Sequence, residues 1–381
     1  MKRMLSIIFV CSLLLTLVAG CAQDEVVTEP TAAPAPTEAL AEPDPESELA
    51  AEGESLNIVS TIFPQYDWVR EILGDKAENM DLTLLISTAV DLHSFQPSVS
   101  DIVAMSTADL FIYVGGASDD WVEDVLRHST NPDMITIDLM EVLGDGAKLD
   151  EIIEGMQHDR DDCELDDEDD CDDDSHDHGH SRDHDHDDDD HDDDHDHSHD
   201  HHDEFDEHVW LSLRNAVIFC HAIAEALSTL DPVNADVYAA NLAAYTEKLM
   251  ALDAEYTAAL QNLENRTLLF ADRFPFRYLV DDYDLSYYAA FTGCSAETEA
   301  SFSTIIFLAG KVDELGLDVV MVTESGNRAI AETVISNTES GDQRILELDS
   351  MQSVTAIDVQ NGVTFLSIME SNLNVLREAL R

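Results

Sequence analysis

The chain has 381 residues, of which 44% are hydrophobic, and this is enough to build two medium-sized domains with ordinary cores. Its formal net charge is −64, and residues 159–207 alone contribute −26, with 28 Asp and Glu against two Arg. A surface this acidic repels nucleic acid and anionic lipid head groups and attracts cations, which argues against nucleic-acid binding.

Residues 1–21 are typical of a bacterial lipoprotein signal peptide. A basic "MKRM" precedes the apolar "LSIIFVCSLLLTLV", and small residues stand directly before Cys21 in "LVAGC". We therefore expect Cys21 to carry a lipid and to hold the protein outside the cytoplasm, on the bacterial cell membrane. An ordinary signal peptide and an uncleaved anchor are the alternatives. No other stretch approaches the ~20 apolar residues of a spanning helix.

The region between the leader and the first predicted strand has the composition of a disordered tether. Residues 22–54 hold five of the ten prolines and ten acidic residues. Beyond it, residues 55–229 are predicted to form an α/β lobe, because strand-like runs alternate with amphipathic segments. The strand-like runs are residues 56–63, 81–86, 110–116 and 134–139.

A long helical pattern and a second alternation follow. Residues 230–263 show a helical period with Asp231-Pro232 at the start, and one helix of that length spans over ~40 Å. Residues 264–381 are predicted to form a second α/β lobe, with strands at 266–272, 285–291, 317–324 and 344–349. The predicted fold is thus two α/β lobes with mainly parallel sheets, joined by one long rigid helix.

Residues 159–204 form a low-complexity insert in the first lobe. Eleven His residues alternate with Asp between positions 176 and 202. Imidazole nitrogen and carboxylate oxygen both bind divalent zinc, but a chain without a core pre-organises no single geometry. We expect several weak, exchanging metal sites here, with a purely solvating acidic segment as the alternative.

The cysteines suggest no zinc knuckle, since no CxxC motif occurs. Cys163 and Cys171 flank "ELDDEDD" and could pair locally, whereas Cys220 lies on an apolar helical face and is expected to be a buried thiol. The disulfide state of Cys163, Cys171, Cys220 and Cys294 stays open.

Two histidines are better candidates for a defined site than the insert. His93, in "DLHSFQPSVSDI", follows a strand and precedes a helix, at the edge where ligands bind to open α/β sheets. His208, in "DEHVWLS", stands where the acidic insert ends and an apolar helix begins. No His occurs after residue 221, so ligands from the second lobe have to be carboxylates or a cysteine.

Three acids of the second lobe follow apolar strands: Asp272, Glu324 and Asp349. Each stands at the strand end where a ligand in a cleft would sit. Carboxylates at this position also cap helices, so position alone does not single one out.

In order along the chain, these motifs resemble a known family. They are similar to segments of the zinc- and manganese-binding lipoproteins of ABC importers, which include adhesin-like members. The segments that carry the resemblance are "LNIVSTIFPQYDWVREILGD", "HSFQPSVSDI", the His/Asp-rich insert, "HVWLSLRNA", "ETEASFSTIIFLAGKVDELGL" and "VVMVTESGNRAIAETV". The resemblance covers residues 55–381.

The resemblance implies a metal held in the cleft between the lobes by His93, His208 and Asp349. The third family ligand, a His or Glu, falls on Arg273, which cannot bind a cation. Asp272 or Glu324, a water, or a His of the insert would then replace it, and Arg273 would pair with a carboxylate such as Glu299.

The function that this resemblance implies is extracytoplasmic capture of zinc or manganese and delivery to an ABC permease and its ATPase, by a protein that we expect to be monomeric. The His-rich insert favours zinc, since manganese prefers oxygen ligands and gains less from imidazole. A manganese-binding homologue and a surface adhesin or metal-sequestering lipoprotein are the alternatives. An enzyme is not expected, because a zinc hydrolase needs an open coordination position with a general base, and no HExxH motif occurs.

Overall fold

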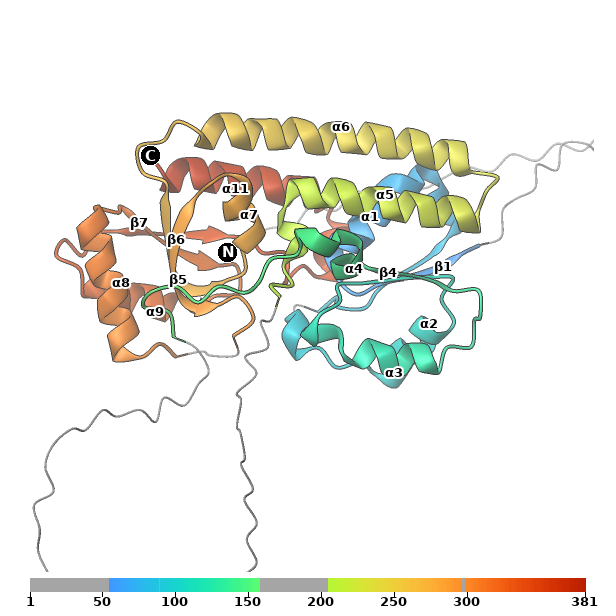
Figure 1. The fold of residues 1–381 in the computed structure, drawn as a ribbon, viewed down its shortest axis with the longest axis horizontal. Helices are drawn as coiled ribbons and strands as arrows, with labels where there is room; N and C mark the ends of the chain where they lie inside the picture. Colours follow the sequence, from blue (N-terminus) through green and yellow to red (C-terminus); the bar gives the residue numbers. More distant parts are fainter. Residues whose placement is uncertain (1–54, 89, 158–204, 296–298) are drawn as a thin grey trace, which may run out of the picture. The chain divides into compact units, whose positions relative to one another are not determined.

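The computed structural model describes residues 55–88, 90–157, 205–295 and 299–381 (Figure 1). The predicted signal peptide, Cys21, the tether and the insert at 159–204 lie outside these residues. Among the described residues, no helix combines the length and the apolar character that a bilayer crossing requires.

Two parallel sheets of four strands organise the described chain, as predicted. The first has the order β2-β1-β3-β4, and the second has the order β6-β5-β7-β8. The strands are β1 (Asn57–Ser60), β2 (Asp81–Leu84), β3 (Leu110–Tyr113), β4 (Ile135–Asp138), β5 (Thr267–Phe274), β6 (Ser286–Thr292), β7 (Val319–Thr323) and β8 (Arg344–Leu348). The inner strands β1, β3, β5 and β7 are mostly apolar and buried, which suits strands covered on both faces, whereas the edge strands β2 and β8 are more exposed.

The helices follow the amphipathic segments of the sequence. They are α1 (Phe63–Leu73), α2 (Val99–Ser106), α3 (Trp121–Arg127), α4 (Leu139–Leu143), α5 (Leu213–Leu230), α6 (Ala235–Leu260), α7 (Arg277–Asp282), α8 (Phe302–Leu315), α9 (Arg328–Ser336), α10 (Ala356–Gln360) and α11 (Phe365–Ala379). Helix α5 begins later than the predicted helical run at residue 209, because Ser212 caps it by accepting a hydrogen bond from the Asn215 amide.

Helix α6 contacts helices that belong to both halves of the chain. It has 26 residues and packs against α1 and α5 as well as against α11 (Figure 1). The Tyr256 hydroxyl donates to the Met369 carbonyl at 2.6 Å, which joins α6 to α11. The two lobes are therefore bridged by direct packing along this helix.

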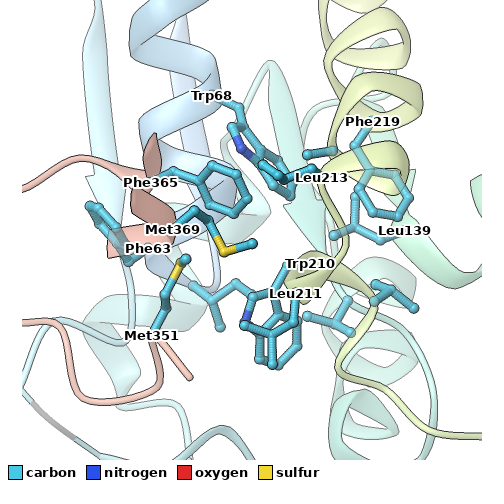
Figure 2. Close-up of a cluster of buried hydrophobic side chains, with 14 of the residues drawn as sticks. Phe63, Trp68, Leu139, Trp210, Leu211, Leu213, Phe219, Met351, Phe365 and Met369 are labelled. Atoms are coloured by element: carbon cyan, nitrogen blue, oxygen red, sulfur yellow. The ribbon is translucent and has the colours of Figure 1, made fainter. Parts of the chain in front are cut away.

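One apolar core continues from the first lobe into the second (Figure 2). The ring of Trp68 on α1 lies 5.7 Å from that of Phe219 and 5.2 Å from that of Phe365, which begins α11. The buried Asp67 carboxylate accepts a hydrogen bond from the Phe365 amide at 2.8 Å. Opening the lobes widely would expose these side chains, so the packing opposes a wide hinge motion.

The chain on either side of the insert is held in place. Leu149 and Phe205 form an antiparallel bridge, and the Asp206 amide donates to the Lys148 carbonyl at 2.8 Å. Gln157 forms a parallel bridge with Phe291 of β6. The segment before the insert thus reaches β6 at Gln157, whereas the Lys148 backbone bonds Asp206 and the Tyr278 hydroxyl.

Candidate metal centre

His93 and His208 lie together, although 115 positions separate them in the sequence. Their Nε2 atoms are 3.4 Å apart. His93 belongs to a short 3₁₀ turn, Leu92–Ser94, that follows β2, and His208 caps a second turn, Val209–Leu211, that leads into α5. His208 is fully buried, whereas the His93 side chain is 14% exposed. The solvent-accessible side of the pair is therefore the His93 side.

The Nδ1 atom of each ring faces an oxygen, which leaves both Nε2 atoms directed at one point. His208 Nδ1 lies 3.1 Å from Asp206 Oδ1, and His93 Nδ1 lies 2.5 Å from Ser118 Oγ and 3.6 Å from Glu207 Oε2. Histidines that bind metals commonly donate their second N–H to such oxygens, which fixes the tautomer. The pair is thus oriented as two metal-binding imidazoles.

A third side chain with a metal-binding atom completes this cluster. Cys294 follows β6, and its Sγ lies with one ring nitrogen of His93 and one of His208 within 4.8 Å of one another. Cys294 and the buried Cys220 are free thiols. Sequence reasoning allowed a cysteine ligand from the second lobe but did not single out Cys294, which follows Gly293 at a strand end.

Gly293 gives His208 the space that its ring needs. A Cβ atom at position 293 would lie 2.9 Å from His208 Cε1 and 3.0 Å from the Phe274 carbonyl oxygen. The His208 ring therefore lies directly against the backbone next to Cys294, and only glycine leaves room for this approach.

The charges around His93 and His208 favour the binding of one cation by the two rings. Burial and the neighbouring His208 lower the pKa of His93 to about 4, which favours its neutral, metal-binding form. Burial also acts to lower the pKa of His208, but Asp206 and Glu207 outweigh it and raise that pKa. Burial raises the pKa of the Cys294 thiol. A metal that binds these atoms displaces protons from His208 and Cys294.

Arg273, which the resemblance matched to the third ligand position, forms an ion pair next to the two histidines. Its Nη1 pairs with Asp91 Oδ2 at 2.7 Å, and Asp91 Oδ1 accepts a hydrogen bond from the His93 amide at 3.0 Å. The structure thus gives Arg273 the partner Asp91, where the sequence suggested a carboxylate such as Glu299. The contact links β5 to the His93 turn across the lobes.

Two acids predicted as possible ligands are occupied by backbone contacts. Asp272 Oδ2 accepts hydrogen bonds from the Thr323 amide and hydroxyl, at 2.8 and 2.7 Å. Glu324 accepts hydrogen bonds from the Ser350 amide, at 2.8 Å, and the Gln352 amide, at 3.1 Å. Asp272, which lies within β5 and not after it as predicted, therefore ties β5 to the end of β7, and Glu324 holds the loop after β8. Neither belongs to the cluster of His93, His208 and Cys294.

Asp349 follows β8 and also stands outside that cluster. Its Oδ1 accepts a hydrogen bond from the Met351 amide at 2.8 Å. Burial and the nearby Glu324 raise its pKa to about 7. The next residue, Ser350, accepts a hydrogen bond at its carbonyl from Trp210 Nε1 at 2.9 Å, which brings this loop close to the His208 segment.

Comparisons with known proteins agree on one family. A family model described as zinc-uptake complex component A, periplasmic, matches residues 58–379. A zinc-binding protein AdcA of Streptococcus pyogenes is 28% identical over 330 residues, which are 87% of this chain and 57% of that protein. The high-affinity zinc uptake system protein ZnuA of Bacillus subtilis is 24% identical over 87% of this chain and 89% of its own length. This chain thus spans just over half of the AdcA sequences it matches.

Solved structures share the fold. The Zn(II)-bound ZnuA-like domain of Streptococcus pneumoniae AdcA superposes with a TM-score of 0.61 at 24% identity, and covers 86% of this chain and 99% of that domain. The laminin-binding protein Lmb of Streptococcus agalactiae, described as an adhesin with metal-transporting activity, superposes with a TM-score of 0.62 at 20% identity, over 86% of this chain and all of Lmb. At these identities the likeness concerns the fold alone.

Proposed function

Because this chain belongs to the zinc-uptake complex component A family, we propose that it captures zinc between its lobes and delivers the ion to an ABC permease. The observation that carries the proposal is the pair of converging imidazoles. Two nitrogens that each lie about 2.0–2.1 Å from a tetrahedral zinc ion are about 3.3 Å apart. The two Nε2 atoms are 3.4 Å apart, so their spacing matches that of two imidazole ligands of one zinc ion.

The other ligands come from the second lobe. We propose Asp349 as the carboxylate ligand, supported by its partial burial, by the nearby Glu324 carboxylate, and by the hydrogen bond that brings Ser350 to Trp210. When residues of both lobes bind the ion, they would give up the protons that they carry without it. The core shared by the two lobes restricts the lobe movement that accompanies release of the ion to small displacements.

A zinc competition titration against a chromogenic chelator tests the site. His93→Ala, His208→Ala and the double variant are compared with His221→Ala, whose side chain is exposed on α5. We expect the two single variants to lose at least tenfold in zinc affinity, and the double variant to lose tight one-to-one binding. His221→Ala should bind like the parent. Tight binding by a double variant that is folded by circular dichroism would refute the site.

The location and partners follow from the same proposal. We propose that Cys21 is lipidated and anchors the protein outside the cytoplasm, where an ABC permease with its ATPase receives the zinc. Labelling growing cells with a radioactive fatty acid tests the anchor. Label in the parent and none in Cys21→Ala is expected, with the variant released from the membrane. Equal membrane retention of both forms would contradict the proposal.

A further inference from the structure

Cys294 has the placement of a metal ligand rather than of a core residue. It is only partly buried, in contrast to Cys220, whose side chain is wholly enclosed on α5. Its sulfur lies in the group formed with the ring nitrogens of His93 and His208. The Glu207 backbone N–H donates a hydrogen bond to this thiol, so the residue before His208 also contacts it.

The carboxylates around the two imidazoles contact the Nδ1 side of the rings or other groups, and Glu207 Oε2, 3.6 Å from His93 Nδ1, is buried without a hydrogen-bond partner. Asp206 accepts from His208, Asp91 pairs with Arg273, and Glu207 Oε1 accepts a hydrogen bond from the Ser118 amide at 2.9 Å. These acids orient the ligands and do not belong to the converging group. Among the described residues, the third donor in that group is a sulfur.

The distances allow the sulfur to reach the ion. A nitrogen and a sulfur ligand of one tetrahedral zinc ion are about 3.6 Å apart, given Zn–N and Zn–S bonds of about 2.05 and 2.3 Å. The three atoms already lie within 4.8 Å of one another. A shift of about 1.2 Å at most therefore completes an N₂S set, and rotation of the Cys294 side chain provides movement of this size.

Building on the proposed function, we propose that Cys294 binds the ion as a thiolate and makes the protein selective for zinc and cadmium over manganese. The metal–sulfur bond forms as the thiol proton leaves to solvent, with no change in oxidation state. Thiolate favours soft and borderline ions, whereas manganese prefers oxygen ligands. With Asp349 in the fourth position, the set would be two nitrogens, one sulfur and one oxygen.

Absorption of the cadmium-loaded protein reports the sulfur bond directly. The full chain is used with every cysteine except Cys220 and Cys294 replaced by Ala, so that the other thiols do not contribute. One equivalent of cadmium should give a thiolate-to-metal charge-transfer band in this protein and in its Cys220→Ala variant. Cys294→Ser should lack the band. A band of parental size in Cys294→Ser, or none in the parent, overturns the proposal.

Metal preference separates this inference from the proposed function. We expect Cys294→Ser to bind zinc at least tenfold more weakly, and Cys294→Asp to lower the preference for zinc over manganese at least tenfold. Parental zinc affinity and preference in both variants would refute the role of Cys294, while the zinc-capture proposal would stand if His93→Ala still weakened binding. If His93→Ala and His208→Ala also bound like the parent, the zinc-capture proposal would fail as well.

Discussion

Replacing Gly293 by Ala should damage the metal site without placing any change on a ligand. The added Cβ would lie 2.9 Å from His208 Cε1 and 3.1 Å from Nδ1. Carbon atoms in ordinary contact are about 3.5 Å apart, so the ring or the strand has to move by about 0.6 Å. Metal–ligand distances tolerate about 0.2 Å. The displacement is therefore about three times the tolerance of the bond to zinc.

The local packing blocks the simplest escape for the ring. His208 is fully buried, its Nδ1 is held by Asp206, and its ring lies 5.2 Å from that of Trp210 (Figure 2 shows the position of Trp210). On the other side, the Phe274 carbonyl lies 3.0 Å from the new Cβ. Because changes around metal-binding histidines typically cost roughly 10- to 100-fold in affinity, we expect a loss of that size for Gly293→Ala.

The assay is a zinc competition titration at fixed pH, with Gly310→Ala as the matched control. Gly310 lies in α8, and a Cβ there meets nothing within 4 Å. This control should keep parental zinc affinity and gain about 0.5–1 kcal/mol in stability, since Ala is the better helix former. Parental zinc affinity in a folded Gly293→Ala protein would refute the claim that close ring-to-backbone contact positions His208.

Three further predictions concern other parts of the chain. Asp206→Asn, which keeps the shape but removes the charge beside His208, should lower zinc affinity about tenfold in the same titration. Burial raises the pKa of Asp67 to about 6, so the parent loses stability as the pH rises from about 4 to 6. Urea unfolding of the metal-free protein measures this fall in the free energy of unfolding, and Asp67→Asn should remove up to about 3 kcal/mol of it. The same dependence of stability on pH in the parent and the variant would contradict this prediction. Deleting residues 159–204 should abolish weak zinc sites in equilibrium dialysis and leave one tight site, whereas loss of the tight site would show that the insert supplies a ligand.

The strands could be predicted because their signal is local. Most are short runs rich in apolar residues, and each of the eight predicted runs overlaps an observed strand, although β5 and β6 extend past the predicted ends to Phe274 and Thr292. Helices α4 and α10 were not predicted, since five residues are too few to show a helical period. Helix α5 begins at Leu213 and not at residue 209, where the apolar run starts, because Ser212 caps the helix.

Sequence reasoning found only part of the candidate metal centre, because the remaining residues come together through contacts between distant segments. His93 and His208 stand out at a strand end and at the edge of the acidic insert. Nothing near Cys294 in the sequence shows that β6 ends beside His208, and nothing near Arg273 shows that Asp91 faces it. A cysteine two residues after a strand, in a chain with no His after residue 221, is the signal that could have indicated Cys294. Asp349 as a ligand stays a prediction.

The apolar core that runs through both lobes makes the described chain a single folding unit, even though its two sheets are separate. An ion that binds only the native form therefore stabilises the whole unit, by about 2.7 kcal/mol at a free concentration 100 times the dissociation constant. We expect copies without zinc to unfold more often and to be cleaved first by extracellular proteases. In a cell starved of zinc, the abundance of this protein would then follow its occupancy.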